Sequence, residues 1–378
     1  MPSSSTLPDA TDSIAKAVTP EPVDIQGFHL VSEDAGWLLF DRYLYWTQDG
    51  GQSWNSITPT NLEPYAIRAV SFLDAQSGWL ILSATEQANP FVIAQTSDGG
   101  KTWESRALSL FAPGDVNANV SAFYFYWLDR QTGWLVTRRA TGSNFDTGAL
   151  FKTTDSGKNW TRLTAPTGDP VYFVTREFGW MAGGPAGEQL HRTMDGGSTW
   201  QSQSIPGWGT GQSIQRKFFL PRFANDREGL LPTILAAGTE TRVQFYRTQD
   251  GGQTWNLETD LAVSPGSAPD IHLPLAVVSP RESVLLLPER KRALRTIDRL
   301  STTLAGSDPW ISGIDELDMV TLQVGWANHR SGNCSPLQTN ARSTPLIKNT
   351  VDCVAQARLL YTNDGGASWQ ALPLPKID

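Results

Sequence analysis

The sequence is poor in cysteine, histidine and methionine, with two, four and four of these residues in 378 positions. The histidines are scattered and show no metal-ligand spacing, and they are His29, His191, His272 and His329. We therefore expect no bound metal, and no motif in the chain suggests another cofactor. Charged residues make up 18% of the chain, and the net charge is -8. Because nucleic-acid binding depends on a basic surface, we expect no nucleic-acid partner.

Long apolar runs are also missing, since none reaches the roughly 18 residues that a membrane-spanning helix requires. The chain likewise lacks a nucleophile elbow, a phosphate-binding P-loop and a zinc-binding helix motif. In contrast, it contains 33 Gly, 24 Pro and 15 Trp. Many turn-forming residues among large aromatic residues predict short strands joined by tight turns, and hence an all-β fold.

An eight-residue unit with the pattern Thr-x-Asp-(Gly/Ser)-Gly-x-(Ser/Thr/Asn)-Trp recurs six times, and we call it the box. Its copies occupy residues 47–54, 96–103, 153–160, 193–200, 248–255 and 362–369. A Gly-Trp pair precedes most boxes, at Gly36-Trp37, Gly78-Trp79, Gly133-Trp134, Gly179-Trp180 and Gly325-Trp326, with Gly229-Leu230 as a weaker copy. A fixed period of this kind indicates a repeat architecture.

The spacing of the boxes predicts how many units there are. Successive box aspartates lie 40 to 57 residues apart, but 114 residues separate Asp250 from Asp364. This double gap predicts a degenerate unit in which 284–287 replaces the Gly-Trp strand and 296–302 replaces the box, with Asp298 as its aspartate. Seven units of roughly 50 residues suit four-stranded blades. We predict a seven-bladed β-propeller of four-stranded antiparallel blades over residues 25–378, after a leader over residues 1–24.

Within each unit, short alternating runs between Gly, Asp and Asn turns predict four strands. The box is then the turn between the third and fourth strands. Its glycines permit a positive φ angle, and its carboxylate accepts local backbone N–H groups. We therefore assign a structural role to the aspartates of all seven units, which are Asp49, Asp98, Asp155, Asp195, Asp250, Asp298 and Asp364.

These boxes resemble the Asp-box family, also called bacterial neuraminidase repeats, over nearly the whole chain after the leader. Propellers of that family include sialidases, xyloglucan-cleaving glycosidases, sortilin-type receptors and the photosystem II stability/assembly factor group. The Gly-Trp strands paired with nearly every box, in seven units, look most like the last group. The resemblance implies a folding role for the boxes. The insertion between Arg330 and Arg358 departs from the compact pattern of that group, so its photosystem role is not carried over.

Strand order divides the turns between two faces. The box face carries the boxes and the turns between first and second strands, whereas the loop face carries the turns between second and third strands and the connections between blades. Binding residues concentrate in irregular loops, which here lie on the loop face. The candidate binding residues are Arg138, Arg139, Arg216, Arg222, Arg242 and Arg292, with the non-repeat tryptophans Trp208 and Trp310.

Arginine pairs with carboxylates, and loop tryptophans anchor protein partners or stack on sugars. This set of residues therefore predicts a protein or glycan partner. The plainer alternative is a solvated rim of mixed charge, with the two tryptophans filling gaps between blades.

The leader and the cysteines indicate where the protein works. Residues 1–24 are rich in Ser, Thr and Pro, which is typical of a flexible linker after a removed export signal or a lipid anchor. An ordinary flexible N-terminus is the alternative. Cys334 and Cys353 share one polar insertion, which favours a disulfide over two free thiols. We expect a location outside the cytoplasm: secreted, periplasmic or lipid-anchored.

Two functions remain open. The favoured one is a non-catalytic, monomeric scaffold that binds a protein or a glycan through the loop face. The alternative is a sialidase-like glycoside hydrolase, which needs two carboxylates about 5–9.5 Å apart across a cleft. Asp146, Asp270 and Asp315 are candidates, but no spacing singles out a pair. The Arg-Ile-Pro stretch of sialidases is absent, and typical sialidases have six blades.

Overall fold

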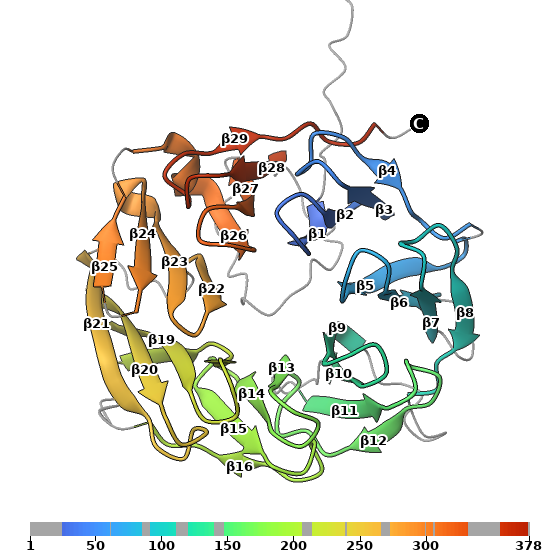
Figure 1. The fold of residues 1–378 in the computed structure, drawn as a ribbon, viewed down its shortest axis with the longest axis horizontal. Coiled ribbons are helices and arrows are strands. Elements are labelled where there is room, and N and C mark those ends of the chain that lie inside the picture. The colour runs from blue at the N-terminus through green and yellow to red at the C-terminus, as the bar shows by residue number, and fades with distance from the viewer. Residues whose placement is uncertain are drawn as a thin grey trace, which may run out of the picture.

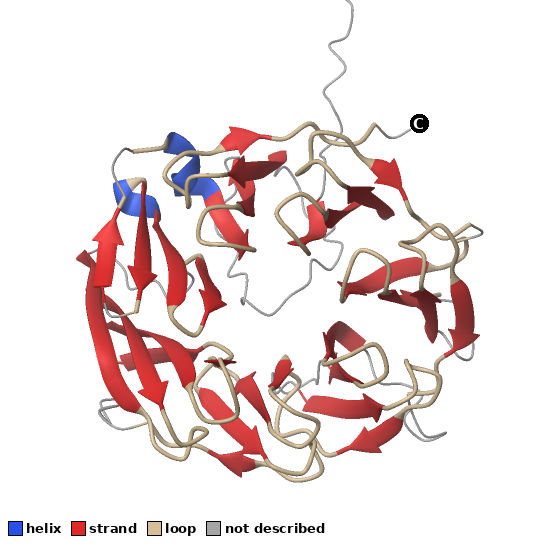
Figure 2. Ribbon diagram, viewed as in Figure 1, coloured by secondary structure: helices blue, strands red, loops and turns tan. Residues whose placement is uncertain are grey.

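The computed structural model describes residues 25–60, 62–84, 91–110, 120–139, 147–205, 214–238, 240–265, 273–298, 300–304, 307–331 and 356–376. Within these ranges, seven antiparallel sheets stand in a ring around a central axis (Figure 1). Strands dominate, and the two short 3-10 helices η2 (Pro288–Arg290) and η3 (Pro309–Gly313) lie close together (Figure 2). No helix in this part of the chain is long and apolar enough to cross a membrane. The predicted all-β, seven-bladed β-propeller is confirmed.

Each blade is built from consecutive strands, ordered from the axis outwards. The inner strands are β1 (Ile25–Leu30), β5 (Ala66–Phe72), β9 (Val120–Trp127), β13 (Val171–Phe173), β17 (Ile214–Phe218) with β18 (Arg222–Phe223), β22 (Leu275–Ser279) and β26 (Ile314–Met319). The second strands are β2 (Gly36–Phe40), β6 (Gly78–Ser83), β10 (Gly133–Arg139), β14 (Gly179–Gly183), β19 (Gly229–Ala237), β23 (Glu282–Leu287) and β27 (Gly325–Ser331). The third strands are β3 (Tyr43–Thr47), β7 (Phe91–Thr96), β11 (Thr147–Thr153), β15 (Gln189–Thr193), β20 (Glu240–Thr248), β24 (Arg292–Ile297) and β28 (Gln356–Thr362). The outer strands are β4 (Asn55–Ser56), β8 (Glu104–Ala107), β12 (Thr161–Leu163), β16 (Gln201–Ser202), β21 (Asn256–Pro265), β25 (Leu300–Thr303) and β29 (Gln370–Ala371).

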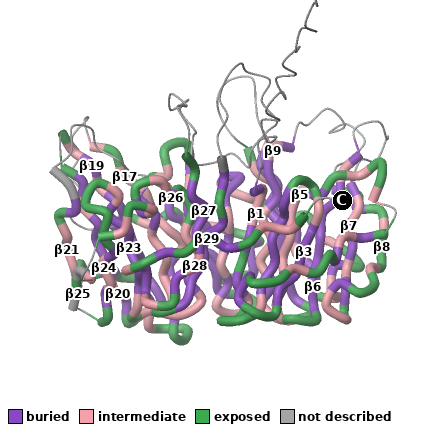
Figure 3. The backbone as a smooth tube through the Cα atoms, turned by 90° about the horizontal axis from the view of Figure 1, so that it is seen from above, coloured by how far each residue is buried: buried purple, intermediate pink, exposed green. Residues whose placement is uncertain are grey.

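The core is divided among the contacts between blades. Each of seven hydrophobic clusters draws its buried side chains from two neighbouring blades, so every interface has its own cluster. Because successive strand residues point to opposite faces of a sheet, a blade packs against both neighbours with the same strands. Seen from the side, buried residues fill the strands and exposed ones gather at the turns (Figure 3).

The Gly-Trp signature has a steric explanation. A Cβ atom on Gly78, Gly133 or Gly179 would lie 2.4–2.5 Å from the aromatic side chain that ends the preceding inner strand. The glycine therefore makes room for that ring. The tryptophan beside it is fully buried in the interface, as at Trp79 and Trp134.

These tryptophans also connect neighbouring blades through hydrogen bonds. The indole of Trp79 donates to the carbonyl of Ser156, in the box of the next blade, at 3.2 Å. Trp134 donates in the same way to Gly196 at 3.0 Å. A second set runs backwards, because the box tryptophan Trp103 donates to the carbonyl of Ile57, which follows the preceding blade's outer strand, at 2.8 Å. The repeat thus encodes the contacts between blades as well as the turns.

All six boxes share one hydrogen-bonded geometry. The Thr hydroxyl donates to the Asp Oδ1 atom at 2.7–2.9 Å. The same carboxylate accepts the backbone N–H four residues later at 2.8–3.0 Å and that residue's side chain at 2.5–2.7 Å. Hydrogen bonds from Ser53 and Thr102, respectively, lower the pKa values of Asp49 and Asp98 to about 2. These carboxylates are occupied in shaping turns.

The degenerate sixth unit does not keep this geometry. Ile297 pairs directly with Leu300, which leaves Asp298 in a two-residue hairpin with a φ angle of 53°. Asp298 donates its backbone N–H to Arg281, just as each intact box donates to the neighbouring first turn. The prediction of Asp298 as a box aspartate is therefore corrected to a hairpin residue. Without the two glycines and the tryptophan, a tight turn replaces the box.

Blade 5 departs from the four-stranded pattern, because its inner strand is split into β17 and β18. Pro232 lies opposite the break, in the middle of β19, and its carbonyl accepts the N–H of Phe219 at 3.1 Å. Proline has no N–H to donate to the inner strand, so the ladder is interrupted at this point. The break moves residues 219–221 out of register, and Phe219 and Leu220 line the axial cavity.

The ring closes through side chains. Blade 7 consists of the C-terminal strands β26 to β29, and blade 1 of β1 to β4. The indole of Trp326 in blade 7 donates to Gly50 at 3.2 Å, and Trp54 in blade 1 donates to Pro373 at 2.8 Å. The two indoles pack with their ring centroids 5.6 Å apart. Closure therefore repeats the contacts made at other interfaces and uses no strand exchange among the described residues.

Candidate functional site: the axial cavity

A cavity of about 920 Å³ lies on the axis of the ring. Its walls come from inner strands of blades 1, 3, 5, 6 and 7, together with residues at the ends of β10 and β14. Pro185–Gly187 of the turn between β14 and β15 are part of the lining, so the cavity reaches the loop face. Polar side chains from at least four blades meet here, which makes it the natural place for a ligand.

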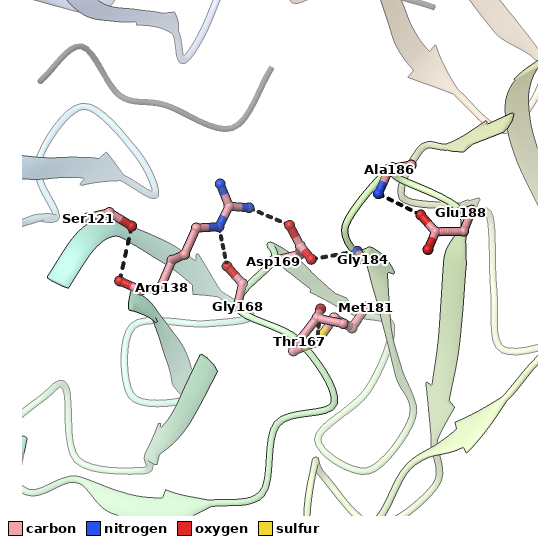
Figure 4. A network of polar contacts seen from close by, with 9 residues as sticks. All are labelled: Ser121, Arg138, Thr167, Gly168, Asp169, Met181, Gly184, Ala186 and Glu188. Carbon is pink, nitrogen blue, oxygen red and sulfur yellow. Dashed lines mark hydrogen bonds and ion pairs between the residues drawn. The ribbon is translucent and has the colours of Figure 1, made fainter. Parts of the chain in front are cut away.

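The wall between blades 3 and 4 contains a buried ion pair (Figure 4). The side chains of Arg138 and Asp169 are 3% and 7% exposed, and the guanidinium Nη2 contacts Asp169 Oδ1. Arg138 Nε also donates to the Gly168 carbonyl at 3.1 Å, while Asp169 Oδ2 accepts the N–H of Gly184 at 2.7 Å. A Cβ atom on Gly183 would lie 2.0 Å from the Asp169 carboxyl carbon. Arg138, predicted as a binding residue, is therefore committed to the wall.

Blade 5 supplies two cationic side chains to the cavity. Lys217 on β17 places its ammonium 5.0 Å from the centre of the Phe219 ring. Arg222 on β18 places its guanidinium carbon 5.1 Å from the centre of the Tyr172 ring, in blade 4. Arg222 forms no ion pair with any residue in the described ranges. Its half-buried guanidinium gives this side of the cavity a positive charge.

The side formed by blades 7 and 1 is acidic. Asp318 Oδ2 lies 3.0 Å from His29 Nδ1 and accepts the N–H of Leu30 at 2.7 Å. Burial lowers the pKa of His29, but the charge and hydrogen bond of Asp318 outweigh it and raise the pKa above its usual value. On the same strand, desolvation and the charges of Asp315 and Asp318 raise the pKa of Glu316 to about 7.

The carboxylates give little support to hydrolysis. Asp169 and Asp318, which line the cavity, are both bound by a cationic or histidine side chain and a backbone N–H. Asp315 pairs with Arg330 at 3.0 Å, and Asp146 and Asp270 lie outside the described residues. No group of three or more His, Cys, Asp or Glu side chains is arranged to hold a metal ion within the described ranges.

The remaining predicted binding residues are dispersed. Arg139 ends β10 and Arg216 lies in β17, and both are half-buried. Arg242 on β20 is held by Asp260 at 2.8 Å and by Glu240. Their expected position in loops was therefore wrong. Charged residues stand side by side in two of these segments, at Arg138-Arg139 and Arg216-Lys217, and this made the segments look irregular in sequence.

Arg292 and Trp310 lie elsewhere on the loop face. Arg292 begins β24 and is exposed. Trp310 lies in η3, half-buried, with its ring centroid 4.9 Å from that of His329. Its packing against the cluster between blades 6 and 7 fits the gap-filling alternative. Trp208, Cys334 and Cys353 lie outside the described residues, as does the leader 1–24.

The sequence does not single out Asp169 or His29 as site residues, and it marks Asp318 only as one of several acidic residues interleaved on the loop face. Asp169 stands in a Gly-Asp-Pro segment directly before a three-residue inner strand. The proline in this segment was the one feature of the sequence that could have pointed to a fixed position for Asp169. The sequence pattern marks Lys217 only as the neighbour of the candidate residue Arg216. The inner strands carry no repeat signature, so their contribution to the cavity was not visible.

Comparisons with known proteins found one family model and several relatives. The family model described as "Photosynthesis system II assembly factor YCF48" matches residues 10–169. The photosystem II assembly lipoprotein Ycf48 of Synechococcus sp. (strain CC9902) is 30% identical over 195 residues, covering 49% of this chain and 46% of that protein. The chloroplastic photosystem II stability/assembly factor HCF136 of Arabidopsis thaliana is 28% identical over 130 residues, covering 33% and 27%. The chain thus spans less than half the length of these curated relatives.

Among solved structures, YCF48 from Cyanidioschyzon merolae is 17% identical with a TM-score of 0.48, covering 82% of this chain and 93% of that one. A structure titled "YCF48 bound to D1 peptide" is 17% identical with a TM-score of 0.38, covering 76% and 93%. An ancestral GH74 enzyme is 12% identical with a TM-score of 0.48, covering 91% and 54%. The family model and the curated relatives together show that part of this β-propeller chain is similar to the photosystem II assembly factors.

Proposed function

We propose that this chain is a non-catalytic scaffold that binds a partner protein, and that the axial cavity receives an acidic segment of that partner from the loop face. One observation carries this proposal: the carboxylates of the cavity already have partners, whereas one of its cations has no carboxylate partner among the described residues. Asp169 and Asp318 are held by neighbouring groups, whereas Arg222 has no carboxylate partner among the described residues. A partner's carboxylate would supply the charge-assisted hydrogen bonds that Arg222 and Lys217 can donate.

The relatives support the same reading. Their names describe assembly factors, and the Synechococcus relative is named a lipoprotein. We therefore propose a location outside the cytoplasm, a propeller domain over residues 25–378 and a leader over residues 1–24 that links it to a lipid anchor. A monomer suffices for this role, because the cavity is built within one ring.

Binding of a fluorescently labelled poly-glutamate ten-mer, measured by polarisation, tests the cavity. The Arg222→Gln and Lys217→Gln variants should each weaken binding about 10-fold or more, since a hydrogen bond to a charged group contributes about 1.5–3 kcal/mol. Arg281→Gln is the matched control, because it removes an exposed positive charge from the box face. Equal affinities in all three variants would contradict the proposal.

The same preparations discriminate the hydrolase. A panel of fluorogenic glycosides, including sialosides, should show no turnover by the purified chain. Turnover that is lost on Asp315→Asn would replace the scaffold with a glycosidase. Binding of a neutral oligosaccharide that survives Arg222→Gln would instead assign the loop face to a glycan.

A further inference from the structure

The turn between β23 and β24 presents three consecutive cationic side chains to solvent on the loop face of blade 6. Arg290, Lys291 and Arg292 are all exposed. Helix η2 gives the turn a defined shape, because Lys291 takes a left-handed φ angle of 51° and donates its N–H to Pro288 at 3.1 Å. The charges are therefore displayed from a fixed turn.

This positive surface continues onto blade 7. The N–H of Asp308 donates to the Lys291 carbonyl at 2.9 Å, which joins η2 to the segment that carries Trp310. The guanidinium carbon of Arg358 lies 5.6 Å from the centre of the Trp310 ring. We call Arg290, Lys291, Arg292, Arg358 and Trp310 the basic ridge.

The carboxylate within this segment is already occupied. Asp308 Oδ1 accepts the N–H of Trp310 at 2.9 Å, and its Oδ2 accepts the N–H of Trp369 at 2.7 Å. Asp308 thus serves as the N-terminal cap of η3. Set against the four cations of the ridge, Glu289 is the one further carboxylate in the turn, so the ridge keeps a net positive charge within a chain of net charge -8.

Three other loop-face arginines are matched by carboxylates. Arg42 pairs with Glu63 at 2.9 Å, and Arg242 pairs with Asp260 at 2.8 Å. Arg330 pairs with Asp315 at 3.0 Å. No such pair holds Arg290, Lys291 or Arg292 within the described ranges. The ridge therefore presents cationic side chains that lack a carboxylate partner within the described ranges.

We propose that the basic ridge docks the propeller on an anionic lipid surface, with the loop face turned toward the membrane. The first strand fixes this orientation: Ile25 pairs with Phe40, next to the turn between β2 and β3, so the chain enters β1 from the loop face. A lipid anchor upstream, which belongs to the proposed function, would hold the same face near the bilayer. This geometry favours a membrane over an acidic protein as the occupant.

The physical basis is local attraction. A cationic side chain near an anionic membrane contributes about 1 kcal/mol. Screening over about 8 Å at physiological ionic strength limits the repulsion from carboxylates elsewhere on the chain. The ridge can therefore bind although the whole protein is acidic.

Co-sedimentation of the full chain with vesicles tests the proposal. Wild-type protein should bind vesicles that contain 30 mol% phosphatidylglycerol and should not bind pure phosphatidylcholine, and binding should fall as salt rises. The triple variant R290Q/K291N/R292Q should lower the partition coefficient on the order of 100-fold. Asn is chosen at position 291 because it tolerates the left-handed conformation. The control R130Q/R176Q/R281Q removes three positive charges from the box face and should bind as wild type does.

The outcomes separate the alternatives. Equal loss in the two triple variants would show a response to net charge alone and would overturn the proposal. Absence of binding between the wild-type protein and anionic vesicles would also overturn the proposal. If that protein then bound soluble poly-glutamate through the ridge, the occupant would be an acidic protein. Arg222→Gln should leave vesicle binding intact, so a failure of the cavity proposal is distinguishable from a failure of this one.

Discussion

Removing one partner of the Arg138–Asp169 pair should destabilise the propeller by several kilocalories per mole. Arg138→Met keeps much of the side chain's length and apolar contact but leaves the Asp169 carboxylate buried without its cation. An uncompensated buried charge costs about 3–5 kcal/mol. Asp169→Asn should cost a similar amount, because the guanidinium then loses its counter-charge.

The same two blades offer a matched control. Arg176 and Asp129 bridge blades 3 and 4 on the box face at 3.2 Å, with side chains that are 56% and 41% exposed. Exposed pairs contribute about 0–1 kcal/mol because solvent and salt screen them. Arg176→Gln should therefore change the free energy of unfolding by less than about 1 kcal/mol.

Urea denaturation measures both pairs, provided that the slope of free energy against urea is unchanged between variants. The double variant Arg138→Met/Asp169→Asn should lose clearly less than the sum of its single variants, since neither charge is then left alone. A cost below about 1 kcal/mol for Arg138→Met, indistinguishable from Arg176→Gln, would refute the assignment of a buried pair.

Three further predictions concern the wall and the turns. Gly183→Ala should lower the unfolding midpoint in urea, because the new methyl group would displace Asp169; an unchanged midpoint would contradict the steric argument. The free energy of unfolding should fall as pH drops from about 4 to 2, because the unfolded state takes up protons first on aspartates such as Asp98, whose folded pKa is about 2. In this range the unfolding free energy of Asp98→Asn should depend less steeply on pH than that of the wild type. Asp250→Ala should cost about 1–3 kcal/mol by removing an acceptor of several hydrogen bonds, whereas Asp298→Gly should be neutral or slightly stabilising at its φ of 53°; similar thermal shifts would show that the sixth unit keeps a working box.

The repeat made the fold predictable from sequence because each of its residues has one physical task. The box Thr and Asp shape a turn, and the glycine of Gly-Trp clears space for a ring. The tryptophan contacts the next blade. Six intact boxes and one degenerate unit leave little freedom in the architecture. The sixth unit shows the limit of this reasoning, since Thr296 and Asp298 survive in a hairpin of different geometry.

The cavity was far less predictable. Most of its charged residues lie on inner strands, where a residue is selected by what faces the axis, whereas Arg138 lies on β10 and Asp169 precedes β13. The periodic signal is absent there, and three of the six residues of β26 are acidic. The ion pair between Arg138 and Asp169 was also not predictable, because the two residues lie 31 positions apart and meet only when the connection between blades 3 and 4 is folded. Sequence reasoning found arginines on this face, but it did not show which ones are already paired.

The closure of the ring by side chains has a mechanical consequence. A pull on the first and last described strands would load the seam between blades 7 and 1 directly, because β1 and β29 lie in the two blades that meet there. The seam is held by indole–carbonyl hydrogen bonds such as those of Trp326 and Trp54, and by packed rings. These are separate side-chain contacts, and no continuous ladder of backbone hydrogen bonds joins the described strands of the two blades. A tethered molecule under tension would therefore open at this seam first. The other six interfaces would stay joined, because the continuous chain connects their blades.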